Sequence, residues 1–207
     1  ILVQMKEIIL AQQQIMIISH SNPDGDTLGS QLALADAVNQ FGIDAVLINK
    51  DELSVKYSFL NKYEQVRPLE DNEITPKVIV FVDCASMERS GYAANDKRFC
   101  DRIIINIDHH LSNQLYGALN YVQDSAAANV QVIVKLLQVM EAKITPAIAT
   151  ALYLGLSTDT GSFLFDSVSA DTHRLAAELI DAGADTDQVR MNIYESTSVA
   201  KFRLLKH

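Results

Sequence analysis

Short apolar runs alternate along this chain with segments in which apolar residues recur every three or four positions. Four runs have the length and uninterrupted apolar character of buried strands, and they cover residues 15–19, 44–49, 78–82 and 103–107. Segments with helical spacing follow these runs and dominate the second half, at 31–41, 54–61, 126–139, 145–157 and 171–182. Strands that are apolar throughout are typical of parallel sheets buried on both faces. We therefore expect a three-layer α/β fold with a mostly parallel sheet and helices on both faces.

Turn residues set the boundaries of these predicted elements. A loop through Ser30, which contains Pro23 and two glycines, separates the first strand from the first helix, and Gly42 ends that helix. The chain has no repeat, no low-complexity tract and no obvious internal linker. We expect residues 1–196 to form one domain, with a boundary around 197–207.

Composition and charge narrow the classes of function. With 207 residues, 48% of them hydrophobic, the chain can bury a sizeable core. A net charge of −9 argues against a broad grip on long nucleic acid, because surfaces that track phosphates are basic. Any nucleotide substrate should be small or held through metal ions. Cys84 and Cys100 are too few to staple such a domain and indicate a reduced, cytoplasmic setting. Charged and amide residues interrupt the apolar stretch at 1–18, so no membrane span is expected.

Three of the apolar runs end in acids and histidines. These clusters consist of His20, Asp24 and Asp26, of Asp83 alone, and of Asp108, His109 and His110. Taken singly, an aspartate after a strand is more often a helix cap or a turn residue. In open α/β sheets, however, ligands bind at the carboxyl ends of the strands, where all three clusters would meet. None of the clusters contains a lysine or arginine, so only cations could hold this negative charge together.

The first cluster has the chemistry of a site for two ions. Pro23 fixes the backbone of the predicted loop, and Gly25 leaves space between Asp24 and Asp26, so the two carboxylates can point to different ions. A mixture of imidazole and carboxylate ligands suits Mn²⁺ well, while Mg²⁺, Co²⁺ and Zn²⁺ stay open on ligand type. Two divalent ions about 3.5–4 Å apart would activate a water for attack on a phosphoryl group.

A fourth acidic segment, at 154–163, completes a set of motifs that resembles a known family. In this segment Asp159 lies among small and hydroxyl residues near the end of a predicted helix, which alone is equally typical of an ordinary helix terminus. With the triplet Asp108-His109-His110, the stretch 20–30 (HSNPDGDTLGS) and Asp83, it resembles the four ordered motifs of the DHH-family phosphoesterases of the RecJ-like superfamily. The resemblance covers nearly the whole chain.

Within that superfamily, the placement of glycines in the first motif resembles the pattern of one branch. Gly25 between the two acids and Gly29-Ser30 after them resemble the nanoRNase, NrnA-like branch of oligoribonucleases and 3′-phosphoadenosine-5′-phosphate phosphatases. The resemblance implies a DHH phosphoesterase domain that acts on a small nucleotide or a short oligonucleotide.

The resemblance also implies a role for each residue. The first metal would be held by His20, Asp24 and Asp83, and the second by Asp26, Asp83, His109 and Asp159, with Asp83 as the bridge. His110 would face the substrate phosphate as a contact or proton donor, and Asp108 would support the neighbouring histidines. Arg89 is a candidate phosphate contact, although a solvated arginine is the simpler interpretation of that position alone. The implied mechanism is in-line attack of an activated water on phosphorus, with two cations, Mn²⁺ before Mg²⁺ or Co²⁺, neutralising the developing charge.

Two departures from the family pattern concern the substrate. Relatives in this branch commonly carry Ser-Ser-Thr-x-Glu at a helix start, where this chain has residues 127–131 (AANVQ), and this change could alter substrate preference or the tuning of the site. Relatives also carry a C-terminal substrate-binding domain called DHHA1. We expect residues 197–207 to begin the linker to such a domain, which is absent from this chain, so this piece could bind metal yet hydrolyse its substrates poorly.

Two classes of function stay open at this point. The first is a two-metal phosphoesterase for short oligonucleotides or 3′-phosphoadenosine-5′-phosphate, with a family II-type inorganic pyrophosphatase and a single-strand exonuclease as rivals within the class. The second is a catalytically weak module that binds a nucleotide in regulation. The presence of every metal-type residue favours the first, because a binding module needs no bridging acid. The sequence ranks neither the substrates nor the oligomeric state, and a homodimer is left open.

Overall fold

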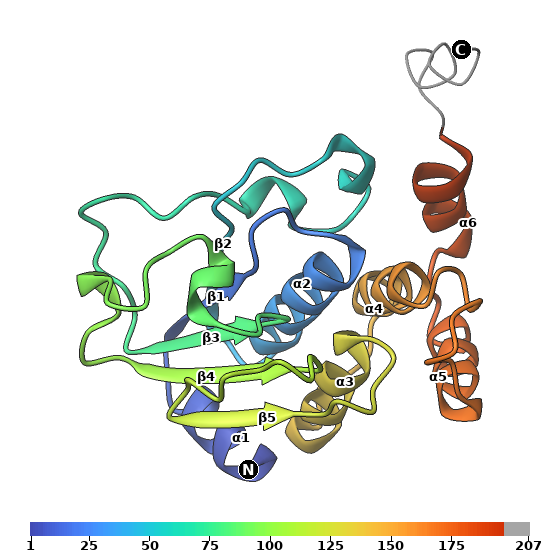
Figure 1. The fold of residues 1–207 in the computed structure, drawn as a ribbon. Coiled ribbons are helices and arrows are strands. Elements are labelled where there is room, and N and C mark those ends of the chain that lie inside the picture. Colours follow the sequence, from blue (N-terminus) through green and yellow to red (C-terminus); the bar gives the residue numbers. More distant parts are fainter. Residues whose placement is uncertain (197–207) are drawn as a thin grey trace.

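Five parallel strands form the centre of the molecule (Figure 1). The computed structural model describes residues 1–196, and the predicted linker at 197–207 lies outside the described residues. The strands pair in the order β2-β1-β3-β4-β5, and their bounds are Gln14–Ser19 (β1), Asp44–Ile48 (β2), Val78–Val82 (β3), Ile103–Asp108 (β4) and Leu119–Val122 (β5). The four predicted strands are confirmed. The edge strand β5 was not predicted, because its four residues are only half-buried and lack the continuous apolar character of the others.

Helices cover one face of this sheet. The α-helices are α1 (Leu2–Leu10), α2 (Gly25–Asn39), α3 (Asn129–Met140), α4 (Pro146–Asp159), α5 (Ala170–Asp181) and α6 (Thr186–Val189), and a π-helix, Arg190–Glu195, continues α6. Alternate strand residues such as Ile17, Val80 and Ile105 are buried in one large core with α1 to α4. Figure 1 shows α2 and α4 next to each other, with α5 and α6 farther from the sheet.

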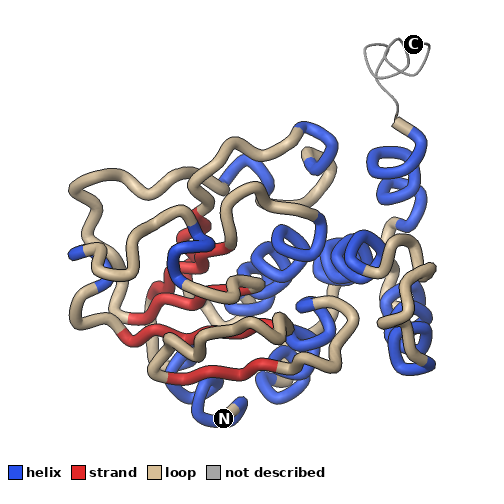
Figure 2. The backbone as a smooth tube through the Cα atoms, in the orientation of Figure 1, coloured by secondary structure: helices blue, strands red, loops and turns tan. Residues whose placement is uncertain are grey.

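The opposite face of the sheet has a thinner cover. Here Ile18, Ile79 and Phe81 pack under the short 3-10 helices η3 (Met87–Ser90) and η4 (Lys97–Phe99) and the loops around them. Figure 2 shows the strands flanked on this side by loops and single helical turns. The predicted three-layer α/β architecture is confirmed. On this face of the sheet, however, the covering layer contains 3-10 turns in place of α-helices.

Two predicted helices were wrong, one in its start and one in its type. The first helix, expected at 31–41 after a loop, begins at Gly25, because Asp24 caps it by accepting hydrogen bonds from the backbone N–H groups of Asp26 and Thr27, both at 3.0 Å. Glycines that resembled loop residues therefore lie inside a helix. The helix expected at 54–61 forms only the 3-10 turn η1 (Val55–Tyr57), which is too short for its apolar spacing to stabilise an α-helix.

Gly29 shows why a glycine is needed within α2. A Cβ atom on Gly29 would lie 2.4 Å from the carbonyl oxygen of Ala151 in α4, so only glycine lets the two helices approach this closely. In residues 1–196, no helix combines the length and the apolar character needed to cross a membrane.

Candidate metal centre

The acids and histidines singled out in the sequence meet at the carboxyl edge of the sheet. Ser19 of β1 pairs with Val82 of β3, and Val82 pairs with Ile107 of β4, so the residues that follow these three strand positions come together. The strand order reverses between β1 and β3, because β1 connects outward to β2 while β3 begins on its other side. Ligand sites in open α/β sheets lie at this kind of switch point.

A first group of ligand atoms comes from the β1–α2 junction and from β3. Atoms of His20, Asp24 and Asp83 lie within 4.8 Å of one another, and His20 Nε2 is 3.5 Å from Asp83 Oδ2. His20 and Asp83 are buried, whereas Asp24 is exposed at the opening of the group. Thr27, which the sequence did not single out, places its hydroxyl oxygen 2.5 Å from His20 Nε2, 2.7 Å from Asp83 Oδ2 and 3.0 Å from Asp24 Oδ1. The first group can hold one cation.

A second group surrounds His109. Its Nε2 atom lies 3.5 Å from Asp83 Oδ1, 3.5 Å from Asp159 Oδ2 and 3.8 Å from Asp26 Oδ2. The other ring nitrogen, Nδ1, lies 3.1 Å from the carbonyl oxygen of Ala126, to which a protonated Nδ1 donates. That tautomer leaves the Nε2 lone pair directed at the three carboxylates, as a metal-binding histidine requires.

Asp83 joins the two groups. It follows β3 with a left-handed backbone (φ 55°), and its own N–H donates to the carbonyl oxygen of Ile107, so the turn still belongs to the sheet. Oδ2 faces the first group, and Oδ1 faces His109 with no hydrogen-bond partner although it is fully buried. An unpaired buried carboxylate oxygen amid other acids fits a bridge between two divalent cations.

The carboxylates repel one another in the absence of cations. Burial raises the pKa of Asp26 well above its usual range, and the charges of Asp83 and Asp159 raise it further. Burial also raises the pKa of Asp159, to about 6, although His109 partly offsets this. Cations would reverse these shifts, because a positive charge favours the ionised form of every acid around it.

Asp26 is held by a helix that lies far from it in the sequence. The backbone N–H of Asn129 donates to Asp26 Oδ2 at 2.5 Å, and the N–H of Val130 donates to Asp26 Oδ1 at 2.9 Å. The N-cap of α3 is Ala128, whose side chain cannot accept a hydrogen bond, so the carboxylate of Asp26 takes the place of a cap. The AANVQ stretch thus supports a predicted metal ligand through its backbone.

The neighbouring helix α4 makes room for this arrangement at Gly155. A Cβ atom there would lie 2.5 Å from Val130 Cγ1 and 2.9 Å from Asp26 Oδ1. Three helices therefore meet around one carboxylate, and the closeness of their backbones depends on a missing side chain.

Asp108 and His110 form a pair that adjoins the two groups, because a ring nitrogen of His110 lies within 4.8 Å of ligand atoms of Asp83 and His109. Nδ1 of His110 lies 2.8 Å from Asp108 Oδ1, and the side-chain amide of Asn113 donates to Asp108 Oδ2 at 2.6 Å. The hydrogen bond to Asp108 raises the pKa of His110, and burial opposes this only partly. Asp108 therefore orients His110, while His109 is oriented by a backbone carbonyl instead.

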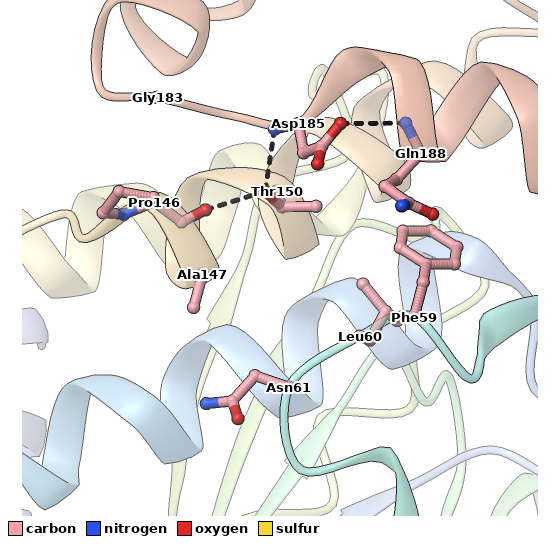
Figure 3. Close-up of a pocket in the computed structure, with 9 residues that line it drawn as sticks. All are labelled: Phe59, Leu60, Asn61, Pro146, Ala147, Thr150, Gly183, Asp185 and Gln188. Atoms are coloured by element: carbon pink, nitrogen blue, oxygen red, sulfur yellow. Dashed lines mark hydrogen bonds between the residues drawn. The ribbon is translucent and has the colours of Figure 1, made fainter.

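Arg89 lines a cavity beside this centre, and another cavity lies elsewhere in the fold. Arg89 is exposed and lines a cavity with His110. A different cavity of about 310 Å³ opens between the chain at 59–61 and helices α4 and α6 (Figure 3). Its wall holds no histidine or cysteine, and its one acid, Asp185, already accepts a hydrogen bond from the N–H of Gln188. We therefore assign the chemistry to the strand-end groups.

Comparison with known proteins gives a consistent result. Residues 14–156 match the family described as "DHH family, N-terminal domain". The chain is 32% identical over 169 residues to the bifunctional oligoribonuclease and PAP phosphatase NrnA of Thermus thermophilus, an alignment that covers 82% of this chain and 50% of that protein. It is 29% identical to the NrnA of Bacillus subtilis (88% and 57% covered) and 28% identical to the cyclic-di-AMP phosphodiesterase GdpP of the same organism (98% and 33% covered). The chain thus spans about half the length of its NrnA relatives.

Solved structures share the fold. An exopolyphosphatase-related protein of Bacteroides fragilis superposes with a TM-score of 0.90 at 21% identity, covering 99% of this chain and 63% of that one. A putative family II inorganic pyrophosphatase of Methanococcus jannaschii superposes with a TM-score of 0.63 at 18% identity, covering 87% and 59%. At these identities the likeness is one of architecture.

Proposed function

The chain belongs to the DHH family, and from this membership we propose that it is a metal-dependent phosphoesterase that hydrolyses short oligonucleotides or 3′-phosphoadenosine-5′-phosphate by a two-metal mechanism. The observation that carries the proposal is the convergence of two ligand groups on Asp83, whose Oδ1 is buried without a hydrogen-bond partner. The names of the NrnA relatives support the substrate class. The free cysteines, Cys84 and Cys100, support the cytoplasmic location expected from the sequence.

The ligand set defines what the chain would hold. One ion would be bound by His20, Asp24 and Asp83, and the other by Asp26, Asp83, His109 and Asp159. Carboxylates with two imidazoles suit Mn²⁺ best, with Mg²⁺ and Co²⁺ as substitutes. When bound, such ions would polarise the phosphoryl oxygens and lower the pKa of an attacking water.

The remaining work falls to the pair of Asp108 and His110. During hydrolysis the water oxygen forms a bond to phosphorus while the bond from phosphorus to the leaving oxygen breaks. The attacking water releases its proton to solvent, and His110 supplies a proton to the leaving oxygen. Asp108 fixes the ring through Nδ1 and raises the pKa of His110, so the histidine keeps its proton at a higher pH than a free imidazole does.

The decisive experiment is phosphate or mononucleotide release with and without Mn²⁺. We expect no turnover after treatment with EDTA, recovery on adding Mn²⁺, and loss of activity in Asp83→Ala and His109→Ala. Asp44→Ala is the matched control, because Asp44 lies at the start of β2, at the opposite edge of the sheet. Wild-type turnover by Asp83→Ala would remove the assignment of the site.

A substrate panel separates the rivals within the class. Inorganic pyrophosphate, a dinucleotide, 3′-phosphoadenosine-5′-phosphate and cyclic di-AMP are offered to the same preparation. We expect the dinucleotide or the bisphosphate to be hydrolysed fastest, because the NrnA relatives align with higher identity than GdpP does. Selective hydrolysis of pyrophosphate would favour the pyrophosphatase alternative, and binding without hydrolysis of any substrate would favour the regulatory module.

A further inference from the structure

A cavity of about 370 Å³ adjoins the metal centre on the side of His110. It lies between the chain that follows β3 and the chain that follows β4, and its wall is formed by Ala85, Ser86, Arg89, His110, Ser112 and Gln114. His110 belongs both to this wall and to the surroundings of the centre, because its Nδ1 is 3.7 Å from Asp83 Oδ1. A molecule with one group at the metal ligands can therefore extend past His110 into the cavity.

Backbone hydrogen bonds fix the wall in place. The N–H and the hydroxyl of Ser21 both donate to the carbonyl oxygen of Arg89, at 2.8 and 3.0 Å, which ties Arg89 to the residue next to His20. The N–H of Gln114 donates to the carbonyl oxygen of Ala85 at 2.9 Å, which joins the two loops. These bonds thus fix the backbone of Arg89 beside the candidate metal ligands.

Arg89 differs from the other arginines in the described part of the chain. The guanidinium groups of Arg67, Arg98, Arg174 and Arg190 form ion pairs, and that of Arg102 donates to Thr75. Within residues 1–196, the guanidinium of Arg89 has neither an ion-pair nor a hydrogen-bond partner. A cation without a partner in the wall of a polar cavity, in a protein of net charge −9, provides a local attraction for an anion.

Three other polar side chains of the wall also lack hydrogen-bond partners among the described residues. Among the described residues, the side chains of Ser86, Ser112 and Gln114 form no hydrogen bonds, although all three line the cavity. Hydroxyl and amide groups complement a guanidinium in binding a phosphate, since arginine offers a pair of parallel donors and they supply further ones.

We propose that this cavity is an anion subsite that binds a second phosphate of the substrate, at about one sugar from the phosphate being hydrolysed. The inference rests on the proposed function and narrows it, because it makes nucleoside bisphosphates and oligonucleotides better substrates than monophosphates. Arg89 is the main contact, and Ser86, Ser112 and Gln114 contribute hydrogen bonds. The substrate thus lies across His110, with a phosphate on each side of the ring.

The test compares substrates that differ by one phosphate. 3′-Phosphoadenosine-5′-phosphate, adenosine 3′-phosphate and adenosine 5′-phosphate are assayed with Mn²⁺ on the wild type, Arg89→Gln, Arg89→Lys and the control Arg174→Gln. We expect Arg89→Gln to raise KM for the bisphosphate at least tenfold and to reduce the preference for it, as a ratio of kcat/KM values, by at least tenfold. Arg89→Lys should retain part of the preference, and Arg174→Gln all of it.

Failure of the subsite and failure of the proposed function give different results. An unchanged preference in Arg89→Gln, with an active wild type, would overturn the subsite alone. If the wild type releases phosphate from none of these compounds, the proposed function fails, and calorimetric binding of 3′-phosphoadenosine-5′-phosphate then decides on the subsite. Binding that Arg89→Gln weakens at least tenfold would support the subsite, whereas no binding to the wild type, or equal binding to both, would refute it.

Discussion

One backbone N–H group, that of Asn129, connects the candidate metal centre to helix α3. It donates to Asp26 Oδ2. The substitution Asn129→Pro removes this N–H group and is compatible with the start of helix α3. Asn129 is the first residue of α3, where proline is favoured, and the preceding Ala128 has φ −157° and ψ 149°, the extended conformation that proline requires before it. Asn129→Ala is the matched control. It retains the N–H and loses only the side-chain bond to Ser30, which Asn129→Pro loses too.

Asn129→Pro should lower both the stability of the protein and its affinity for Mn²⁺. Leaving a buried acceptor without its partner costs about 1–3 kcal/mol, so the free energy of unfolding should be lower by about that amount in Asn129→Pro than in Asn129→Ala. The proline ring also puts a carbon atom near the donor that lies 2.5 Å from the carboxylate, so Asp26 Oδ2 has to leave its present position 3.8 Å from His109 Nε2. Loss of an outer partner of a metal ligand typically weakens binding about 10- to 100-fold, and we expect this loss for Mn²⁺ at the second group.

Two measurements decide the matter. Calorimetric titration with Mn²⁺ gives the affinities, and urea unfolding followed by circular dichroism gives the stability of the metal-free proteins. Equal Mn²⁺ affinities in Asn129→Pro and Asn129→Ala would refute the view that the start of α3 positions Asp26. Intact helical signal in both variants is the control for folding.

Three further predictions concern the same centre. Burial raises the folded-state pKa of Asp159 from 3.8 to about 6, so without metal this group contributes stability at low pH that is lost as the pH rises between these two values. In urea unfolding with EDTA, Asp159→Asn should therefore lose less stability over this pH range than the wild type. Parallel pH profiles of the two proteins would contradict the assignment. Gly155→Ala would place a methyl group 2.5 Å from Val130 Cγ1 and should cost about 1–3 kcal/mol in calorimetric unfolding, whereas a more stable variant would show that the helices can separate freely. His110→Gln should lower kcat by about 10²–10⁴ while Mn²⁺ affinity changes little, because the histidine is bonded to Asp108; a parallel loss of metal binding would place it among the ligands.

The sheet was predictable because its strands are unusually uniform. Residues 78–82 and 103–107 are apolar almost throughout, and both form buried central strands where expected. The start of α2 was not, because Gly25 and Gly29 are loop residues by propensity and are used here for close packing against α4. Local preference yielded to a tertiary contact that the sequence does not display.

The candidate site also contains residues that could be predicted from the sequence and residues that could not. The acids and histidines of the two groups were recognisable in the sequence, since several such residues after consecutive strands have few other uses. Their supporting groups were not, because Thr27 and Asn129 act through a hydroxyl and a backbone N–H that any sequence contains. Asn129 lies 103 positions from the aspartate it serves, and only the folded chain brings the two together.

The left-handed turn at Asp83 lowers the stability of the fold. A side chain in that backbone region costs about 1–2 kcal/mol relative to glycine, and a buried carboxylate oxygen without a partner adds to the burden. Glycine would remove the first penalty, and a small apolar residue the second. If Asp83 bridges two cations as proposed, neither replacement could do so, and the stability lost at this position is the cost of that chemistry.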